Sequence, residues 1–157
     1  MKNVEIRNLG GEHLLSGQQG LFATHRFARF DILGEYRGRI VPEGCGGCYC
    51  AALEDRPAKE SLGVDASVSG NEARFINCYY NIADEPNLYF RTAYIDSYPR
   101  LLLVCIKDIE VNEELLLDYG ESYITSYLTP KPAAVPYSVD QLKDSLPLML
   151  DSDDEEV

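Results

Sequence analysis

The sequence predicts one mostly β domain, built from small sheets of short strands with few short helices. Three observations support this prediction. The chain has 157 residues, of which 45% are hydrophobic, enough for one domain with a real core. Glycines and prolines interrupt the apolar segments at short intervals. Several of these segments are rich in β-branched, aromatic and leucine side chains, as strands are.

The individual elements follow from this punctuation. Residues 1–20 contain four glycines, which predict turns around short strands. Gly34 and Gly38 are expected to break a longer strand region into pieces. Residues 42–69 are rich in glycine, proline and charge, with one short helix expected near 58–62. The expected strands are, in chain order, residues 21–23, 27–41, 73–77, 88–94 and 101–106.

The composition changes after residue 128, so residues 1–128 are expected to form the domain. Prolines stiffen the connector that opens the 129–150 region. Within that region, Ser138 and Gln141 have the spacing of a capping box, which predicts a short helix ending at Pro147. The acidic residues of 151–157 predict a disordered tail.

The net charge of −12 argues against direct binding of nucleic acid, which needs a basic surface. It favours a basic partner, such as a lysine- and arginine-rich protein tail. The alternative is that the acidic charge only keeps the protein in solution. The sequence alone assigns no oligomeric state.

The chain is expected to be intracellular, either nuclear or cytoplasmic. Its longest apolar run, residues 101–106, is too short to cross a membrane. The first residues lack the apolar stretch of a secretory signal. The chain has five cysteines, an odd number, which indicates reduced thiols and fits an intracellular compartment.

Four motifs follow one another along the chain. Each alone would be weak evidence, because glycine turns and strand tyrosines are common. They are Gln18-Gln19-Gly20-Leu21-Phe22, Gly34-Glu35-Tyr36-Arg37-Gly38, Arg74-Phe75-Ile76-Asn77-Cys78 and Glu113-Glu114-Leu115-Leu116-Leu117-Asp118-Tyr119-Gly120. In this order they resemble the signature motifs of the SET domain, the fold of protein-lysine methyltransferases. The resemblance covers residues 17–123 and implies a SET fold in which the third and fourth motifs form a pseudoknot.

The resemblance implies S-adenosyl-L-methionine as the cofactor, contacted by two segments. The first segment runs from Gln18 to Phe22, that is Gln18, Gln19, Gly20, Leu21 and Phe22. Its glycine turn allows a ligand to approach the backbone closely. Gln18 stands where the family has a first glycine, unless the loop carries one extra residue. The alternative for this segment is an ordinary hairpin turn.

The second segment contributes Arg74, Phe75, Asn77 and Cys78, and Tyr119 joins it in the implied cofactor site. A cysteine stands at position 78 where the family usually has histidine. PR domains, a divergent branch with active and inactive members, often carry Asn-Cys at this point. A catalytically inactive PR/SET-like protein-binding module is therefore the alternative to an enzyme.

The resemblance assigns catalysis to Tyr119 and Tyr36. A lysine side chain has a pKa near 10.4, so it must lose a proton before it can accept a methyl group. A narrow aromatic channel desolvates the ammonium and aligns the amine. The expected channel residues are Tyr36, Leu117, Tyr119 and Tyr123. Leu117 stands where the family often has an aromatic residue, which favours products beyond monomethyl-lysine; the alternative is a core position.

No metal site is expected. Cys45, Cys48 and Cys50 supply three thiols, whereas a closed zinc site needs four ligands, so Cys78 or Cys105 would have to join them. No cysteine follows Cys105, so the zinc-binding segment that closes the lysine channel in many relatives is not expected. Residues 121–127 are the candidate for that wall. The resemblance thus implies a protein-lysine N-methyltransferase acting on a basic protein segment, with a histone tail as one candidate.

Overall fold

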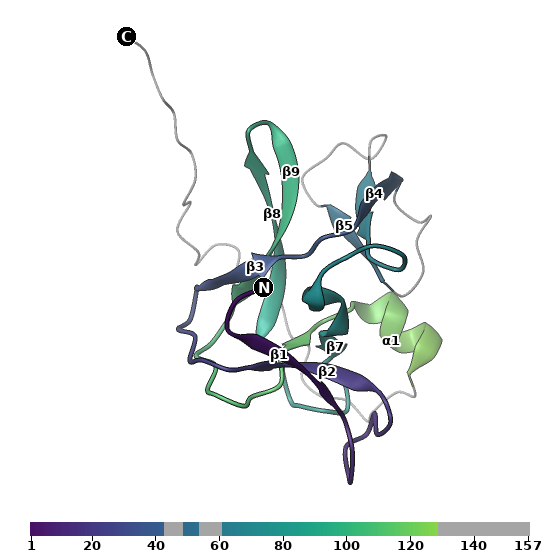
Figure 1. Ribbon diagram of the computed structural model, residues 1–157. Coiled ribbons are helices and arrows are strands. Elements are labelled where there is room, and N and C mark those ends of the chain that lie inside the picture. The colour runs from purple at the N-terminus through teal and green to yellow at the C-terminus, as the bar shows by residue number, and fades with distance from the viewer. Residues whose placement is uncertain (43–48, 54–60, 129–157) are drawn as a thin grey trace.

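The computed structural model describes residues 1–42, 49–53 and 61–128 (Figure 1). The prediction of a mostly β fold of small sheets is confirmed, because the described strands form two sheets of two strands and two sheets of three. The main hydrophobic core lies between these sheets and includes the fully buried side chains of Leu21, Leu88, Leu103 and Leu115. In this part of the chain, no helix is long and apolar enough to cross a membrane.

The first sheet pairs β1 (Val4–Asn8) with β2 (Gln19–Ala23) in antiparallel fashion. The loop between them is closed by backbone hydrogen bonds between Leu9 and Gln18 and between Gly17 and Leu9, both 2.8 Å. This register places Gln19 opposite Asn8 at the end of the hairpin. The predicted turn around short strands in residues 1–20 is therefore present, and its far end projects from the body of the domain (Figure 1).

The second sheet has the order β3 (Ile32–Glu35), β9 (Tyr98–Cys105), β8 (Leu88–Ile95). Asp96 and Ser97 turn between β8 and β9 with φ of 51° and 64°, the left-handed values of a tight hairpin. One face of this sheet joins the main core. The other face carries a smaller cluster formed by Tyr89, Leu102, Val104 and Ile106.

The third sheet has the order β4 (Arg39–Pro42), β6 (Leu62–Asp65), β5 (Cys50–Leu53). The expected strand over 27–41 is thus two strands in different sheets, separated by the glycine-containing turn. Gly38 is required there, because a Cβ atom would lie 2.4 Å from the Asp65 carbonyl oxygen. The short helix expected near 58–62 is contradicted at Leu62, which begins β6; residues 58–60 lie outside the described residues.

The strand expected at 73–77 is wrong for most of its length. Residues Glu72–Phe75 form the 3-10 helix η2, and only then does β7 (Asn77–Cys78) begin. The helical turn brings Ala73 and Ile76, three residues apart, into the core, where each is 1% exposed. A strand would place residues three apart on opposite faces, so this spacing fits the turn. The strand was expected from the aromatic and β-branched side chains of Phe75 and Ile76.

The last sheet pairs β7 with β10 (Leu116–Leu117) in parallel. Asn87 lies on the other side of β10 and is 2% exposed. Its side chain accepts a hydrogen bond from the Leu116 backbone N–H (2.8 Å) and donates to the Glu114 carbonyl (2.7 Å). The fourth motif therefore lies between β7 and the segment that follows it, the crossing that the predicted pseudoknot requires.

Helix α1 (Glu121–Tyr127) follows directly from β10 through Gly120. This helix is not among the elements expected from the sequence. The connector and the capped helix expected in 129–150 and the tail expected at 151–157 lie outside the described residues, as do Cys45 and Cys48. The expected division of the chain at residue 128 therefore stays a prediction.

Candidate functional site

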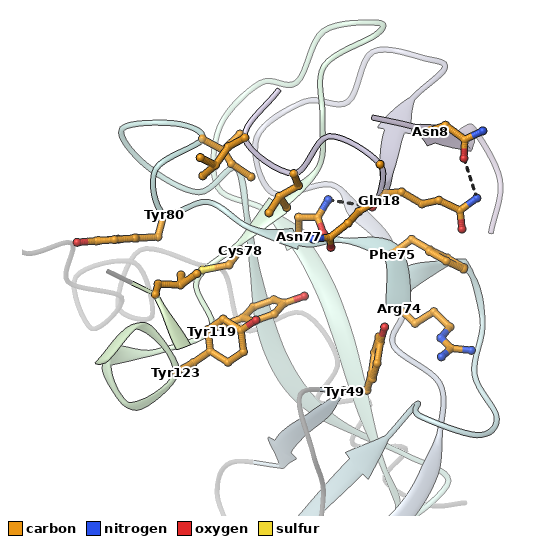
Figure 2. A pocket seen from close by; sticks show the side chains of 16 residues that line it. Asn8, Gln18, Tyr49, Arg74, Phe75, Asn77, Cys78, Tyr80, Tyr119 and Tyr123 are labelled. Carbon is orange, nitrogen blue, oxygen red and sulfur yellow. Dashed lines mark hydrogen bonds between the residues drawn. The ribbon is translucent and has the colours of Figure 1, made fainter. Parts of the chain in front are cut away.

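A cavity of about 740 Å³ lies where the β1–β2 hairpin, η2, β7 and α1 meet (Figure 2). Its walls combine apolar, aromatic and amide side chains with one charged residue, Arg74. The lining residues are Asn8, Leu14, Leu15, Gly17, Gln18, Gln19, Tyr49, Arg74, Phe75, Asn77, Cys78, Tyr80, Ile82, Tyr119, Tyr123 and Leu128. The volume falls in the usual range of small-molecule sites.

Arg74 brings the positive charge to this cavity. Its guanidinium lies 4.9 Å from the ring centre of Tyr49 and 5.7 Å from that of Phe75. One terminal nitrogen, Nη2, donates to the Ser67 carbonyl at 3.1 Å. Its Nε is buried and has no hydrogen-bond partner among the described residues. A buried cationic donor without a partner is costly, and an anionic group in the cavity would relieve that cost.

Asn77 connects the two sides of the cavity. Its side-chain amide donates to the Gln19 carbonyl at 3.1 Å and to Glu114 Oε1 at 3.0 Å. The other carboxylate oxygen of Glu114 lies 2.8 Å from His13 Nε2. His13 Nδ1 in turn accepts a hydrogen bond from the Leu15 backbone N–H. This chain of contacts ties the lining loop of the β1–β2 hairpin to the third and fourth motifs.

Cys78 follows Asn77 and lines the same cavity, although it is only 8% exposed. Burial raises the pKa of its thiol above the ordinary value, which keeps the sulfur protonated near neutral pH. A protonated thiol is a weak nucleophile. Cys78 therefore packs in the cavity wall and is not a candidate nucleophile.

Tyr119 lies at the end of the fourth motif, against the cavity wall. Its hydroxyl donates to the Ile76 carbonyl at 2.5 Å, and its ring packs edge-on against Tyr123 of α1 with centres 4.8 Å apart. Burial, reinforced by neighbouring tyrosines, raises the pKa of Tyr119 above its ordinary value. The phenol is therefore neutral at physiological pH and fixed in orientation from two sides.

Tyr36 lies behind this wall and is 7% exposed. Its hydroxyl donates to the Tyr49 carbonyl at 2.8 Å, and its ring contacts Phe90 edge-on. Burial raises the pKa of Tyr36 as well. Among the described residues, Tyr36 is not part of the cavity lining, and it reaches the cavity through Tyr49.

The predicted site residues divide into two groups. Eight of them line the cavity: Gln18, Gln19, Arg74, Phe75, Asn77, Cys78, Tyr119 and Tyr123. The others lie beside or behind the cavity wall. Leu21 and Leu117 are core residues, 0% and 2% exposed, and the Phe22 ring is covered by Arg7. Gly20 packs closely, because a Cβ atom there would lie 2.7 Å from Glu114 Oε1.

Eight further lining residues were not predicted. Tyr80 follows the third motif closely and could have been found as its extension. The loop residues Leu14 and Leu15 carry no sequence signal, because only the hairpin register and the His13 contact bring them to the cavity. Tyr49 lies between the second and third motifs and belongs to neither. The others are Asn8, Gly17, Ile82 and Leu128.

Within the described ranges, no three His, Cys, Asp or Glu side chains form a group that could bind a metal ion. Cys50 is partly buried in β5, and Cys105 is fully buried in β9. Burial raises the pKa of Cys105 to about 12.

The family assignment follows from a sequence comparison. The sequence model of the SET domain matches residues 18–120 of this chain, which contain all four motifs. The chain belongs to the SET domain family. The predicted family is thereby confirmed, and the parallel contact of β7 with β10 is the junction of its two most specific motifs.

Several curated relatives share this domain. N-lysine methyltransferase KMT5A-A of Xenopus laevis is 29% identical over 124 residues, which are 69% of this chain and 35% of the relative. Histone-lysine N-methyltransferase EZH2 of Chaetomium thermophilum is 27% identical over 131 residues, 73% of this chain and 8% of the relative. The chain therefore spans 35% or less of the length of these two relatives.

Solved structures show the same fold. One is described as ctPRC2 in an autoinhibited conformation bound to S-adenosylmethionine. It matches 76% of this chain and 15% of its own, with a TM-score of 0.60 and 25% sequence identity. A humanized mutant of the Chaetomium thermophilum Polycomb Repressive Complex 2, bound to the inhibitor GSK126, matches with a TM-score of 0.59 and 26% identity, over 75% of this chain and 15% of its own.

Proposed function

We propose that the protein is an S-adenosyl-L-methionine-dependent protein-lysine N-methyltransferase acting on a basic protein segment. The observation that carries the proposal is the cavity itself, where the SET motif residues Asn77 and Tyr119 meet beside Arg74. The relatives are named as lysine methyltransferases, and a structural neighbour is described as bound to S-adenosylmethionine.

The cavity lining fits this cofactor. S-Adenosylmethionine has an apolar and aromatic part, a sulfonium and an amino acid carboxylate. Arg74, whose buried Nε has no hydrogen-bond partner in the part of the chain that the structure describes, would bind the carboxylate. Asn77 and the backbone at Cys78 would contact the cofactor as the family resemblance implies. Tyr80, Ile82 and Leu128 provide the apolar surface that an aromatic base requires.

S-Adenosylmethionine, when bound, supplies a methyl group on a sulfonium that a neutral amine can take by in-line displacement. The protein must bring the lysine amine to its neutral form and align it with the methyl group. A wall of tyrosines around Tyr119 excludes water, which disfavours the ammonium and lowers the pKa of the incoming lysine. The tyrosine rings can accommodate the lysine ammonium before it releases its proton to solvent. Tyr119, fixed by Ile76 and Tyr123, sets the position of the amine.

The proposed substrate is a basic protein segment, with a histone tail as the first candidate. The net charge of −12 attracts such a segment at long range, most strongly at low salt. The names of relatives such as histone-lysine N-methyltransferase EZH2 support the same class. A nuclear or cytoplasmic site of action fits this proposal.

Two measurements test the proposal. Isothermal titration should detect binding of S-adenosylmethionine, and a radiolabelled methyl-transfer assay should label histones or another protein of a cell extract. The control is Tyr119→Phe, which keeps the ring and removes the hydroxyl. Absence of cofactor binding at millimolar concentration would refute the enzyme. It would favour the protein-binding module that Cys78 also fits.

A further inference from the structure

Tyr49 occupies an unusual position for an aromatic side chain. It directly precedes β5 and is 42% exposed to solvent, yet it also lines the cavity. Its ring therefore has one side toward the cavity and part of its surface toward solvent. In Figure 2, Tyr49 stands between the Tyr119–Tyr123 pair and Arg74.

The backbone of Tyr49 is fixed from inside the domain. Its carbonyl accepts hydrogen bonds from the buried Tyr36 hydroxyl at 2.8 Å and from the Ala66 N–H at 3.1 Å. Tyr36 is 7% exposed and packs against Phe90, so it is a rigid support. These contacts fix the backbone of Tyr49, from which its side chain extends, independently of the side-chain rotamer.

The ring of Tyr49 packs against the charged side chain of Arg74. The Arg74 guanidinium lies 4.9 Å from the ring centre, within the distance of a cation–π contact. Tyr49 and Tyr119 line the same cavity. Tyr49 thus bridges the proposed cofactor-carboxylate position and the proposed catalytic tyrosine.

We propose that Tyr49 forms the solvent-facing wall of the lysine channel and determines how well the target lysine enters it. The inference rests on the proposed function and adds a specificity residue to it. Tyr123 packs against Tyr119 from α1, and Tyr49, directly before β5, lines the same cavity. The exposed part of the ring that Arg74 does not cover would attract the incoming ammonium and pack against the lysine methylenes.

This wall would select a substrate that presents a lysine side chain in an extended, solvent-accessible segment. The ring needs no hydroxyl for this role, because the attraction comes from its face. The Tyr36 hydrogen bond goes to the backbone of Tyr49, so it survives any change of the side chain. Tyr36 is then a positioning residue that acts on the channel through Tyr49.

The test compares Tyr49→Ala and Tyr49→Phe in steady-state methyl transfer to a lysine peptide. Loss of the ring should raise the peptide KM about tenfold, the change expected for an aromatic wall that contacts a cation. Tyr49→Phe should stay within about twofold of the unsubstituted protein, because the ring face remains. The Kd of S-adenosylmethionine, measured by calorimetry, should change less than the peptide KM, because Arg74 keeps its hydrogen bond to the Ser67 carbonyl. Tyr98→Ala, at the exposed tip of the β8–β9 hairpin, is the matched control and should leave both constants unchanged.

An unchanged peptide KM in Tyr49→Ala would overturn the inference. Equal losses in Tyr49→Ala and Tyr49→Phe would also overturn it, because they would assign the effect to the hydroxyl. If the alanine variant does not fold, Tyr49→Leu retains much of the apolar volume without a π-face and should still raise the peptide KM. Failure of the unsubstituted protein to bind S-adenosylmethionine would instead refute the proposed function, so the two failures are distinguishable.

Discussion

Asn87 offers the sharpest test of how the site is assembled. Replacing it by leucine keeps a side chain of similar size and removes its hydrogen-bonding groups. The side chain now accepts from the Leu116 N–H at 2.8 Å and donates to the Glu114 carbonyl at 2.7 Å and to Glu113 Oε1 at 3.1 Å. It is 2% exposed, and Leu116 is 4% exposed, so water reaches neither freely.

The magnitude follows from the groups that lose their partners. Two backbone groups, one N–H and one carbonyl, would be left unpaired in or next to β10, and each costs roughly 1–3 kcal/mol. Glu113 is partly exposed and its lost contact adds little. The free energy of unfolding of Asn87→Leu should therefore fall by roughly 2–6 kcal/mol, a large share of the ~5–15 kcal/mol of a typical domain.

Urea denaturation followed by circular dichroism would measure this change. Asn8→Leu is the matched control, because Asn8 is exposed and accepts one long hydrogen bond from Gln19 at 3.2 Å. The control should change stability by less than about 0.5 kcal/mol. A loss below about 1 kcal/mol in Asn87→Leu would refute the role of Asn87 as the clamp on β10.

Four further outcomes are expected. Tyr119→Phe should lower kcat on the order of 100-fold while the domain stays folded, since the ring loses its anchor to Ile76 and misplaces the amine; full activity would refute its catalytic role. Asn77→Ala should raise the Kd of S-adenosylmethionine about tenfold in calorimetry and lower the melting temperature, because two hydrogen bonds are lost; both unchanged would contradict the site. The free energy of unfolding should fall as pH rises above about 10, by up to about 1.4 kcal/mol per pH unit for each buried tyrosine, because Tyr36 and Tyr119 keep their protons in the folded state after the unfolded chain has lost them. This slope, from urea denaturation at alkaline pH, should be smaller in Tyr119→Phe. Leu117→Tyr should cost roughly 1–3 kcal/mol by overpacking a core position, and mass spectrometry should show a shift toward monomethyl-lysine if Leu117 also borders the channel.

The sequence was sufficient to predict the family and the mostly β fold, because the four motifs combine residue types that the site needs in a set order. Asn77 and Tyr119 could be chosen for the same reason. The 3-10 turn of η2 was not predicted because the aromatic and β-branched side chains of Phe75 and Ile76 favour a strand, whereas burial of both Ala73 and Ile76 in the core fits a turn. Here the tertiary contact decides the local conformation.

The rest of the cavity depends on contacts between distant segments. Leu14 and Leu15 reach it through the hairpin register and the His13–Glu114 contact, which no local pattern encodes. Tyr49 reaches it through the backbone hydrogen bond from Tyr36. Leu117 was expected in the channel, and the structure places it in the core beside Cys78, which is consistent with the alternative stated for it.

The parallel pairing of β7 with β10 has a consequence for how the chain folds. Leu116 and Leu117 pair with Asn77 and Cys78 across a long stretch of intervening chain. Closing such a loop costs conformational entropy before the paired residues stabilise the fold. Topologies dominated by distant pairings fold slowly. The β8–β9 hairpin, joined by a tight turn, can form early, whereas the cavity is completed only when the fourth motif inserts. During synthesis, a nascent chain that ends before residue 114 would therefore have most of its strands and no place for the cofactor.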